Sequence, residues 1–163
     1  MASTHKKVIV RKLDRDSVAG FVNPSAFVVD GKVEMLNTSG QVVTVELEEV
    51  KGVYFVRDFD DPNLPARKTF ATRPRTEGLW VRMRFRDNEM MEGLMPNNLA
   101  HLGTDGFLVT PPDTRSNTQR IFVPRSALTE ILVLAVIGGQ HARRRAAAGA
   151  DVRQPGLFGE SST

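Results

Sequence analysis

Residues 80–87 have the sequence Trp80-Val-Arg-Met-Arg-Phe-Arg-Asp87, and this stretch decides how the rest of the chain is interpreted. Its apolar residues alternate with three arginines, Arg82, Arg84 and Arg86. A period of two places the apolar side chains on one face of a β-strand and the arginines on the other. Asp87-Asn88 is typical of a tight turn, so the pattern predicts a hairpin whose second strand passes through Gly93.

The same pattern occurs earlier in the chain. Residues 7–14, Lys7-Val-Ile-Val-Arg-Lys-Leu-Asp14, match the arginine strand at an offset of 73, which also places Gly20 on Gly93. Further on, residues 42–56 match residues 120–134 at an offset of 78. The difference corresponds to a five-residue insertion within 110–118, a stretch of turn-forming residues. The chain is therefore predicted to contain an internal duplication.

Each copy is predicted to contain five short strands. In the first copy they are expected at residues 7–14, up to Gly20, at 33–36, at 42–46 and at 52–56, with a break at 47–50 before the last one. The second copy repeats this order, with its third strand at 107–110. Five short antiparallel strands predict a small barrel, because closing a sheet on itself removes its exposed edges.

The apolar run from Ala127 to Ile137 is compatible with a strand or with a buried helix, because a short apolar run does not distinguish the two. Its match to Val50–Val56 and its content of isoleucine and valine favour the strand.

The order of strands, turns and break resembles the Sm-like barrel of the Sm, LSm and Hfq proteins. The chain from Lys7 to Val136 also resembles an uncharacterised bacterial family of tandem Sm-like modules, on residues 51–59 and 112–123. The resemblance implies an all-β fold of two tandem five-stranded antiparallel barrels. The expected boundaries are residues 6–59 for the first barrel, 60–78 for a linker, 79–138 for the second barrel and 139–163 for a basic tail, disordered or partly helical.

Composition restricts the classes of function. The chain has no cysteine, which excludes disulfides, thiolate metal sites and cysteine nucleophiles. No apolar stretch is long enough for a signal peptide or a membrane span, so a cytoplasmic protein without membrane contact is expected. The three histidines have no nucleophile or ligand pattern nearby, and no phosphate-cradling glycine motif occurs. The sequence predicts a protein that is not an enzyme, with no catalytic, metal or cofactor residues.

Two basic clusters are candidates for contact with RNA or single-stranded DNA: the row Arg82, Arg84 and Arg86, and the run Arg143, Arg144 and Arg145. Guanidinium groups two residues apart on a strand could follow a phosphate backbone. The alternative is a solvated sheet face that prevents edge pairing. In the Sm proteins RNA binding depends on loop residues that have no counterpart here, so no RNA-binding residue is transferred from that resemblance.

The tail carries a short linear motif. Gln154-Pro-Gly-Leu-Phe158 resembles the Gln-x-x-Leu-Phe pentapeptide with which bacterial proteins dock on the replication sliding clamp. The resemblance implies that Gln154 hydrogen-bonds at the rim of a pocket that Leu157 and Phe158 fill. The leading hypothesis is an adaptor that binds a protein partner through this tail. The alternatives are a nucleic-acid-binding module and a structural subunit of an Sm-like ring, which would form a homo-oligomer.

The tail motif generates a direct prediction. A peptide covering residues 150–163 is expected to bind a bacterial sliding clamp in fluorescence anisotropy, because two apolar anchors would enter one pocket. The double substitution Leu157→Ala, Phe158→Ala removes both anchors and should abolish the signal. Absence of binding at high micromolar clamp would exclude clamp docking.

Overall fold

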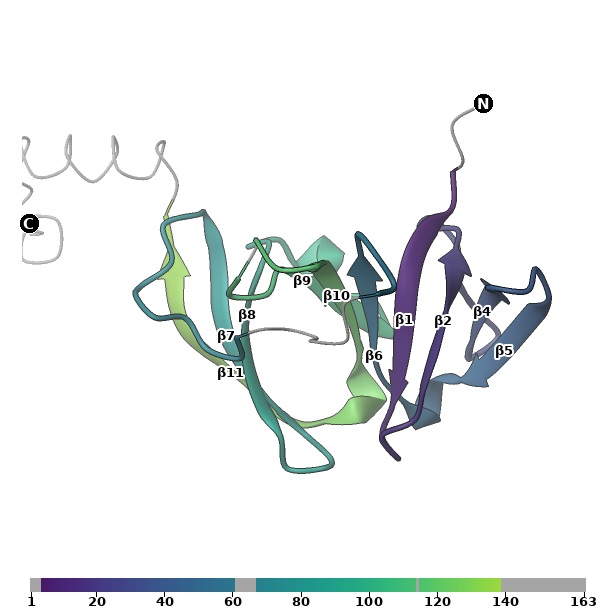
Figure 1. The fold of residues 1–163 in the computed structure, drawn as a ribbon. Helices are drawn as coiled ribbons and strands as arrows, with labels where there is room; N and C mark the ends of the chain where they lie inside the picture. The colour runs from purple at the N-terminus through teal and green to yellow at the C-terminus, as the bar shows by residue number, and fades with distance from the viewer. Residues whose placement is uncertain (1–3, 61–66, 114, 139–163) are drawn as a thin grey trace, which may run out of the picture.

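The computed structural model describes residues 4–60, 67–113 and 115–138 (Figure 1). In the first half of the chain the elements are β1 (Lys6–Lys12), β2 (Ser17–Val22), β3 (Val28–Val29), β4 (Lys32–Asn37), β5 (Val42–Glu46), the 3₁₀ helix η1 (Leu47–Glu49) and β6 (Val50–Val56). In the second half they are β7 (Gly78–Phe85), β8 (Met90–Met95), η2 (Leu99–His101), β9 (Gly106–Val109), β10 (Thr118–Pro124), η3 (Arg125–Ala127) and β11 (Leu128–Ile137).

The all-β class is confirmed, and the predicted strands lie close to their expected positions. The run ending at Ile137 is strand β11, and the break at 47–50 is the single helical turn η1. The alternation in residues 80–87 is also confirmed, since Val81, Met83 and Phe85 are buried. The two-residue strand β3 and the turn η2 have no counterpart among the predicted elements.

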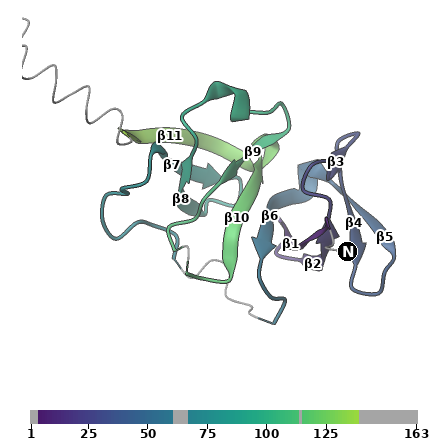
Figure 2. The ribbon, with the colours of Figure 1, turned by 90° about the horizontal axis from the view of Figure 1, so that it is seen from above.

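All the strands pair antiparallel, in two sheets. The larger sheet has the order β3-β4-β2-β1-β6-β10-β9, with β5 on β4, and the smaller has the order β11-β7-β8. One isolated bridge, between Leu94 and Thr110, connects β8 to the end of β9. The larger sheet therefore runs from the first half into the second through the β6–β10 pair, as Figure 2 shows from above.

The expected closure into barrels is wrong: both sheets are open. Strand β6 lies between β1 and β10, and β10 lies between β6 and β9, so β6 has no edge left for β5 and β10 has none left for β11. The 3₁₀ turns η1 and η3 change the direction of the chain just before β6 and β11. Strand β6 then pairs with β1 and β10 rather than with β5, and β11 pairs with β7 rather than with β10. Pairing between the halves has replaced closure within each half.

The described residues form two hydrophobic cores, and each core contains side chains from both halves of the chain. The first core consists of Val8, Val10, Val22, Phe27, Val33, Met35, Val45, Leu47, Val50 and Val53 from the first half, together with Phe122 from β10. The second core lies mainly in the second half, but Ile9, Tyr54 and Val56 from the first half belong to it. Tyr54 is 1% exposed. Each half thus completes the core of the other.

The shared core predicts a single cooperative unit. Tyr54→Ala removes a buried ring from the junction and should lower the free energy of unfolding by about 3–5 kcal/mol. Urea unfolding followed by circular dichroism and by Trp80 fluorescence, which reports the second half, should give one coincident transition. The control Val42→Ala, at a side chain that is 67% exposed, should change little. A Trp80 transition that Tyr54→Ala leaves unchanged would show that the halves are independent.

Candidate interaction surface

Strand β11 is the most exposed apolar element among the described residues. It pairs with β7 along its length, from Leu128 opposite Phe85 to Ile137 opposite Gly78. Its other edge has no strand partner in the part of the chain that the structure describes. Figures 1 and 2 place β11 at one end of the molecule. One edge of a ten-residue strand therefore offers unpaired backbone groups.

The side chains of β11 make this edge apolar. Ile131 is 41% exposed, Leu132 40%, Val133 57%, Leu134 37% and Val136 56%. Successive side chains of a strand point to opposite faces, so exposure of four consecutive residues means that neither face is well covered. Single exposed apolar residues are ordinary, but a contiguous patch marks an interaction site.

Charge does little to protect this edge. Glu130 is the only charged residue of β11, and its carboxylate lies 3.8 Å from Arg84 Nε on the paired side. Natural edge strands are commonly protected from association by lysine, by proline or by a bulge that twists the edge away. The two register shifts of β11, after Leu128 and after Val133, occur in its pairing with β7. The segment Ile131–Val136 contains neither a charged residue nor proline.

An apolar pocket of about 490 Å³ lies against the same strand. Its lining includes Leu79, Met95, Leu102, Phe107, Leu128 and Ile131. Leu99, on the turn η2, stands at this pocket and is 78% exposed. A partner strand placed along β11 would therefore have a hollow beside it for an apolar side chain.

A second free edge lies at the opposite end of the molecule. Within the described residues, strand β5 pairs only with β4, and Figure 1 shows it far from β11. Its first residue, Val42, is 67% exposed, and the next, Val43, is half-buried against the first core. The free edges of β5 and β11 thus lie at opposite ends of the described structure.

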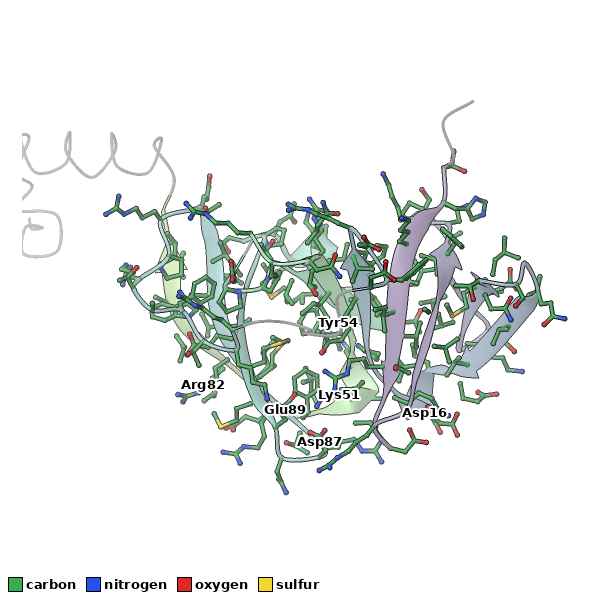
Figure 3. All side chains as sticks on the ribbon, viewed as in Figure 1. Asp16, Lys51, Tyr54, Arg82, Asp87 and Glu89 are labelled. Atoms are coloured by element: carbon green, nitrogen blue, oxygen red, sulfur yellow. The ribbon has the colours of Figure 1, made fainter. Side chains whose placement is uncertain are left out.

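A buried lysine connects the two halves near the junction. Lys51, on β6, is 4% exposed, and its Nζ lies 2.7 Å from Asp87 Oδ2 and 2.7 Å from Glu89 Oε1 in the β7–β8 turn. Lys68 Nζ lies 2.5 Å from the second oxygen of Glu89, and the Phe85 ring lies 5.2 Å from Lys51 Nζ. Figure 3 shows Lys51, Asp87 and Glu89 close together. This cluster fixes the second half against β6.

The ionisation of the cluster follows from these contacts. Partial burial alone would raise the pKa of Asp87, but the hydrogen bonds from Lys51 and from the Glu89 backbone hold it below its ordinary value of 3.8. The pKa of Glu89 is held below 4.5 in the same way, by Lys51 and Lys68 against the opposing effect of burial. Burial raises the pKa of Tyr54 to about 12, although Arg11 acts in the other direction. At neutral pH the Asp87 and Glu89 carboxylates are therefore charged and the Tyr54 hydroxyl is neutral.

The arginine row is only partly available to a ligand. Arg84 pairs with Glu130, and Arg86 donates to the Ser126 carbonyl oxygen at 3.4 Å. The Nε atom of Arg82 is buried and has no hydrogen-bond partner among the described residues. Figure 3 shows the Arg82 side chain directed outward, away from the junction. The row therefore lies on the outer face of β7, beside the apolar strand β11.

The remaining predicted site residues lie outside the described part of the chain. They are Arg143, Arg144 and Arg145 of the second basic cluster and Gln154, Leu157 and Phe158 of the tail motif. In the described ranges, no group of three or more histidine, cysteine, aspartate or glutamate side chains is arranged to hold a metal ion. No helix in those ranges is long and apolar enough to cross a membrane.

The two open antiparallel sheets define the class as an all-β protein. Residues 4–135 match the model of a family of unknown function, DUF6982, and the chain belongs to that family. No curated protein and no solved structure matches the chain.

The sequence contains a signal for the exposed edge of β11. The apolar run ending at Ile137 predicted a strand, and closure of a barrel was expected to cover it. The segment Ile131–Val136 has no polar residue on either face of the strand, which is typical of a strand whose two faces are both covered. In the structure these side chains are exposed, and no second strand pairs with β11 in the described ranges.

The lysine cluster predicts a pH-dependent contribution to stability. Lys51→Met leaves Asp87 and Glu89 without their shared cation and should lower the free energy of unfolding by about 3 kcal/mol at pH 7. Both carboxyls have a lowered pKa in the folded state, so the stabilisation is present above their ordinary values and is lost as the pH falls through the folded-state values. The difference between wild type and variant should therefore shrink at pH 3 in urea titrations.

The matched control is Lys32→Met, which breaks an exposed pair with Glu46. An exposed pair contributes about 0–1 kcal/mol, so this variant should stay close to wild type at both pH values. A loss for Lys51→Met that is equal at pH 7 and pH 3 would contradict the role assigned to the two carboxylates.

Proposed function

We propose that this protein is a non-enzymatic interaction protein that binds an extended segment of a protein partner along the free edge of β11. The observation that carries the proposal is the run of exposed apolar side chains from Ile131 to Leu134 on a strand with one unpaired edge. Backbone hydrogen bonds to such an edge supply affinity, and pockets for alternate side chains supply specificity.

The energetics support an interface at this edge. Apolar area removed from water stabilises association by roughly 25 cal/mol per Å², and the β11 residues keep a large part of that area exposed. The pocket at Leu102 and Phe107 adds a hollow beside the strand. An added strand would cover apolar side chains on both faces and also satisfy the backbone groups of the edge.

We further propose that the two halves are Sm-like modules. Support comes from the strand order: β5-β4-β2-β1-β6 in the first half has its counterpart in the second, where β10 pairs with β9, β9 is bridged to β8, and β8-β7-β11 completes the order. In both halves a single 3₁₀ turn separates the last two strands. The tail motif at residues 154–158 would tether this body to a further partner, and the structural-subunit hypothesis uses the same β11 edge.

Binding of RNA or single-stranded DNA is a weaker candidate. Glu130 pairs with Arg84, which reduces the positive charge that the row offers to phosphate. The neighbouring surface on β11 is aliphatic rather than aromatic, whereas single-strand binding commonly uses stacking on aromatic rings.

The proposal is tested by selecting partners for the edge. Displayed random peptides are selected on the full chain, immobilised at low density so that copies stay apart. The selected peptides should be extended and apolar, and their affinity should fall at least about tenfold for Val133→Lys, which places a charge on the edge. Val133 is 57% exposed, so the substitution should leave the fold intact.

The matched control is Val29→Lys, at an exposed valine of β3. It should bind the same peptides as wild type does. Peptides that bind wild type and Val133→Lys equally, or a selection that yields no binder, would overturn the proposal.

A further inference from the structure

We infer that the strand received by β11 is β5 of a second copy of this chain, so that copies associate head to tail. This inference rests on the proposed function, because it names the partner of the same edge. The two edges lie at opposite ends of the molecule, so they cannot pair within one chain (Figure 1). Among the described residues each lacks one neighbour; β11 exposes an aliphatic run, and β5 exposes Val42 and Thr44.

The chain already contains the junction that the inference repeats. Strand β6, the last of the first half, pairs antiparallel with β10, the fourth strand in the order of the second half. In this pair Arg120 lies opposite Phe55, Ile121 opposite Tyr54 and Phe122 opposite Val53. Strand β11 is the last of the second half, and β5 holds the place of β10 in the first. Pairing β11 with β5 of another copy joins the same two kinds of strand.

Backbone contacts support this equivalence of positions. In the β1–β2 turn, Lys12 N donates to Asp16 O and Arg15 N donates to Lys12 O. In the β7–β8 turn, Phe85 N donates to Glu89 O and Asn88 N donates to Phe85 O, which are the same bonds 73 residues later. Arg15 and Asn88 both have positive φ angles, of 75° and 69°.

The last strands are anchored alike as well. Leu13 N donates to the Glu49 carbonyl oxygen, and Arg86 N donates to that of Ala127. The donors are 73 residues apart and the acceptors 78, as in the sequence match. Strands β6 and β11 therefore leave their halves from equivalent points.

The equivalence gives a register for the new pair. Moving each residue of the β6–β10 pair by 78 places Val42 opposite Val133 and Val43 opposite Leu132. Thr44 then lies opposite Ile131. Every contact in this register joins uncharged side chains, and no like charges face each other.

Burial indicates what the pairing would cover. Tyr54, on β6, is 1% exposed because it enters the core of the second half, whereas its counterpart Leu132 is 40% exposed. In the proposed pair Leu132 would enter the first core of the next copy, where the half-buried Val43 already packs. The exposed area of Leu132 is thus the area that the neighbour would bury.

One contact is not repeated. The counterpart of Lys51 is Thr129, so the ion pairs with the β7–β8 turn have no equivalent at the β1–β2 turn of a neighbour. The interface between copies would be held by backbone hydrogen bonds and apolar contacts alone. Its strength should therefore depend little on salt, unlike that of a charged interface.

The competing arrangement is a symmetric one, in which β11 pairs with β11 of a second copy. The two arrangements differ in closure: a symmetric pair stops at a dimer, whereas a head-to-tail contact leaves a free β5 and a free β11 at the ends of the assembly and continues into a ring or a filament. Complementation between two edge variants separates them.

The experiment uses the full chain and two substitutions, Val133→Lys on β11 and Val42→Lys on β5, with mass measured by light scattering across a concentration series. Wild type should form assemblies larger than a dimer, and each variant alone should be a monomer. An equimolar mixture should form dimers, because β11 of the Val42→Lys chain can pair with β5 of the Val133→Lys chain. Val29→Lys, the control, should assemble as wild type does.

The register is tested by disulfide cross-linking. Because the native sequence has no cysteine, only the introduced cysteines can react. Val43→Cys and Leu132→Cys chains, mixed under mild oxidation, should form a disulfide-linked heterodimer about tenfold faster than Leu132→Cys mixed with Val29→Cys. Leu132→Cys alone should not cross-link at that rate.

The outcomes separate this inference from the function on which it rests. A symmetric dimer, self-cross-linking of Leu132→Cys, or a mixture of edge variants that stays monomeric would overturn head-to-tail pairing. If wild type is a monomer at every concentration while selected peptides still bind at Val133, β11 is a binding edge for another protein and only the self-pairing falls. If neither assembly nor peptide binding depends on Val133, both proposals fall.

Discussion

The pairing of β6 with β10 constrains everything else in this molecule. A strand has two edges, and this pair uses one edge of each, while β1 and β9 use the others. Closure within either half is then blocked, because β6 cannot reach β5 and β10 cannot reach β11. The free edges at β5 and β11 are therefore a direct consequence of the way the two halves are joined.

The junction is held by two different kinds of interaction. Tyr54 and Phe122 cross into the opposite cores and contribute apolar burial, which favours any close contact between the halves without fixing its direction. Lys51 requires the carboxylates of Asp87 and Glu89 within hydrogen-bonding distance, because an unpaired charge at 4% exposure is costly. The ion pairs thus select one arrangement among those that apolar contact would allow.

Local pattern was enough to predict every described strand except the two-residue β3, and the reason is physical. Alternation in residues 80–87, turn residues at Asp14 and Asp87, and the break before Val50 are each determined within a few residues of the chain. The connection between strands is not local. A sequence whose two halves have matching patterns is equally compatible with two closed barrels and with one sheet shared between the halves. Both arrangements bury the same apolar faces of the strands. Lys51 gave no signal because its partners lie 36 and 38 residues away.

The exposure of β11 contrasts with the burial of β6, the strand that matches it in the sequence. Inside the chain, the counterpart strand β6 has a neighbour on each edge, and its side chains at Val53 and Tyr54 are buried. At the end of the second half the equivalent side chains, Ile131 and Leu132, keep the apolar character that such a position needs but have no neighbour among the described residues. A terminal unit that only ended a sheet would stay soluble more easily with a polar outer edge, as the ends of repeat proteins do. The aliphatic composition of β11 therefore supports the proposal that a partner covers this edge.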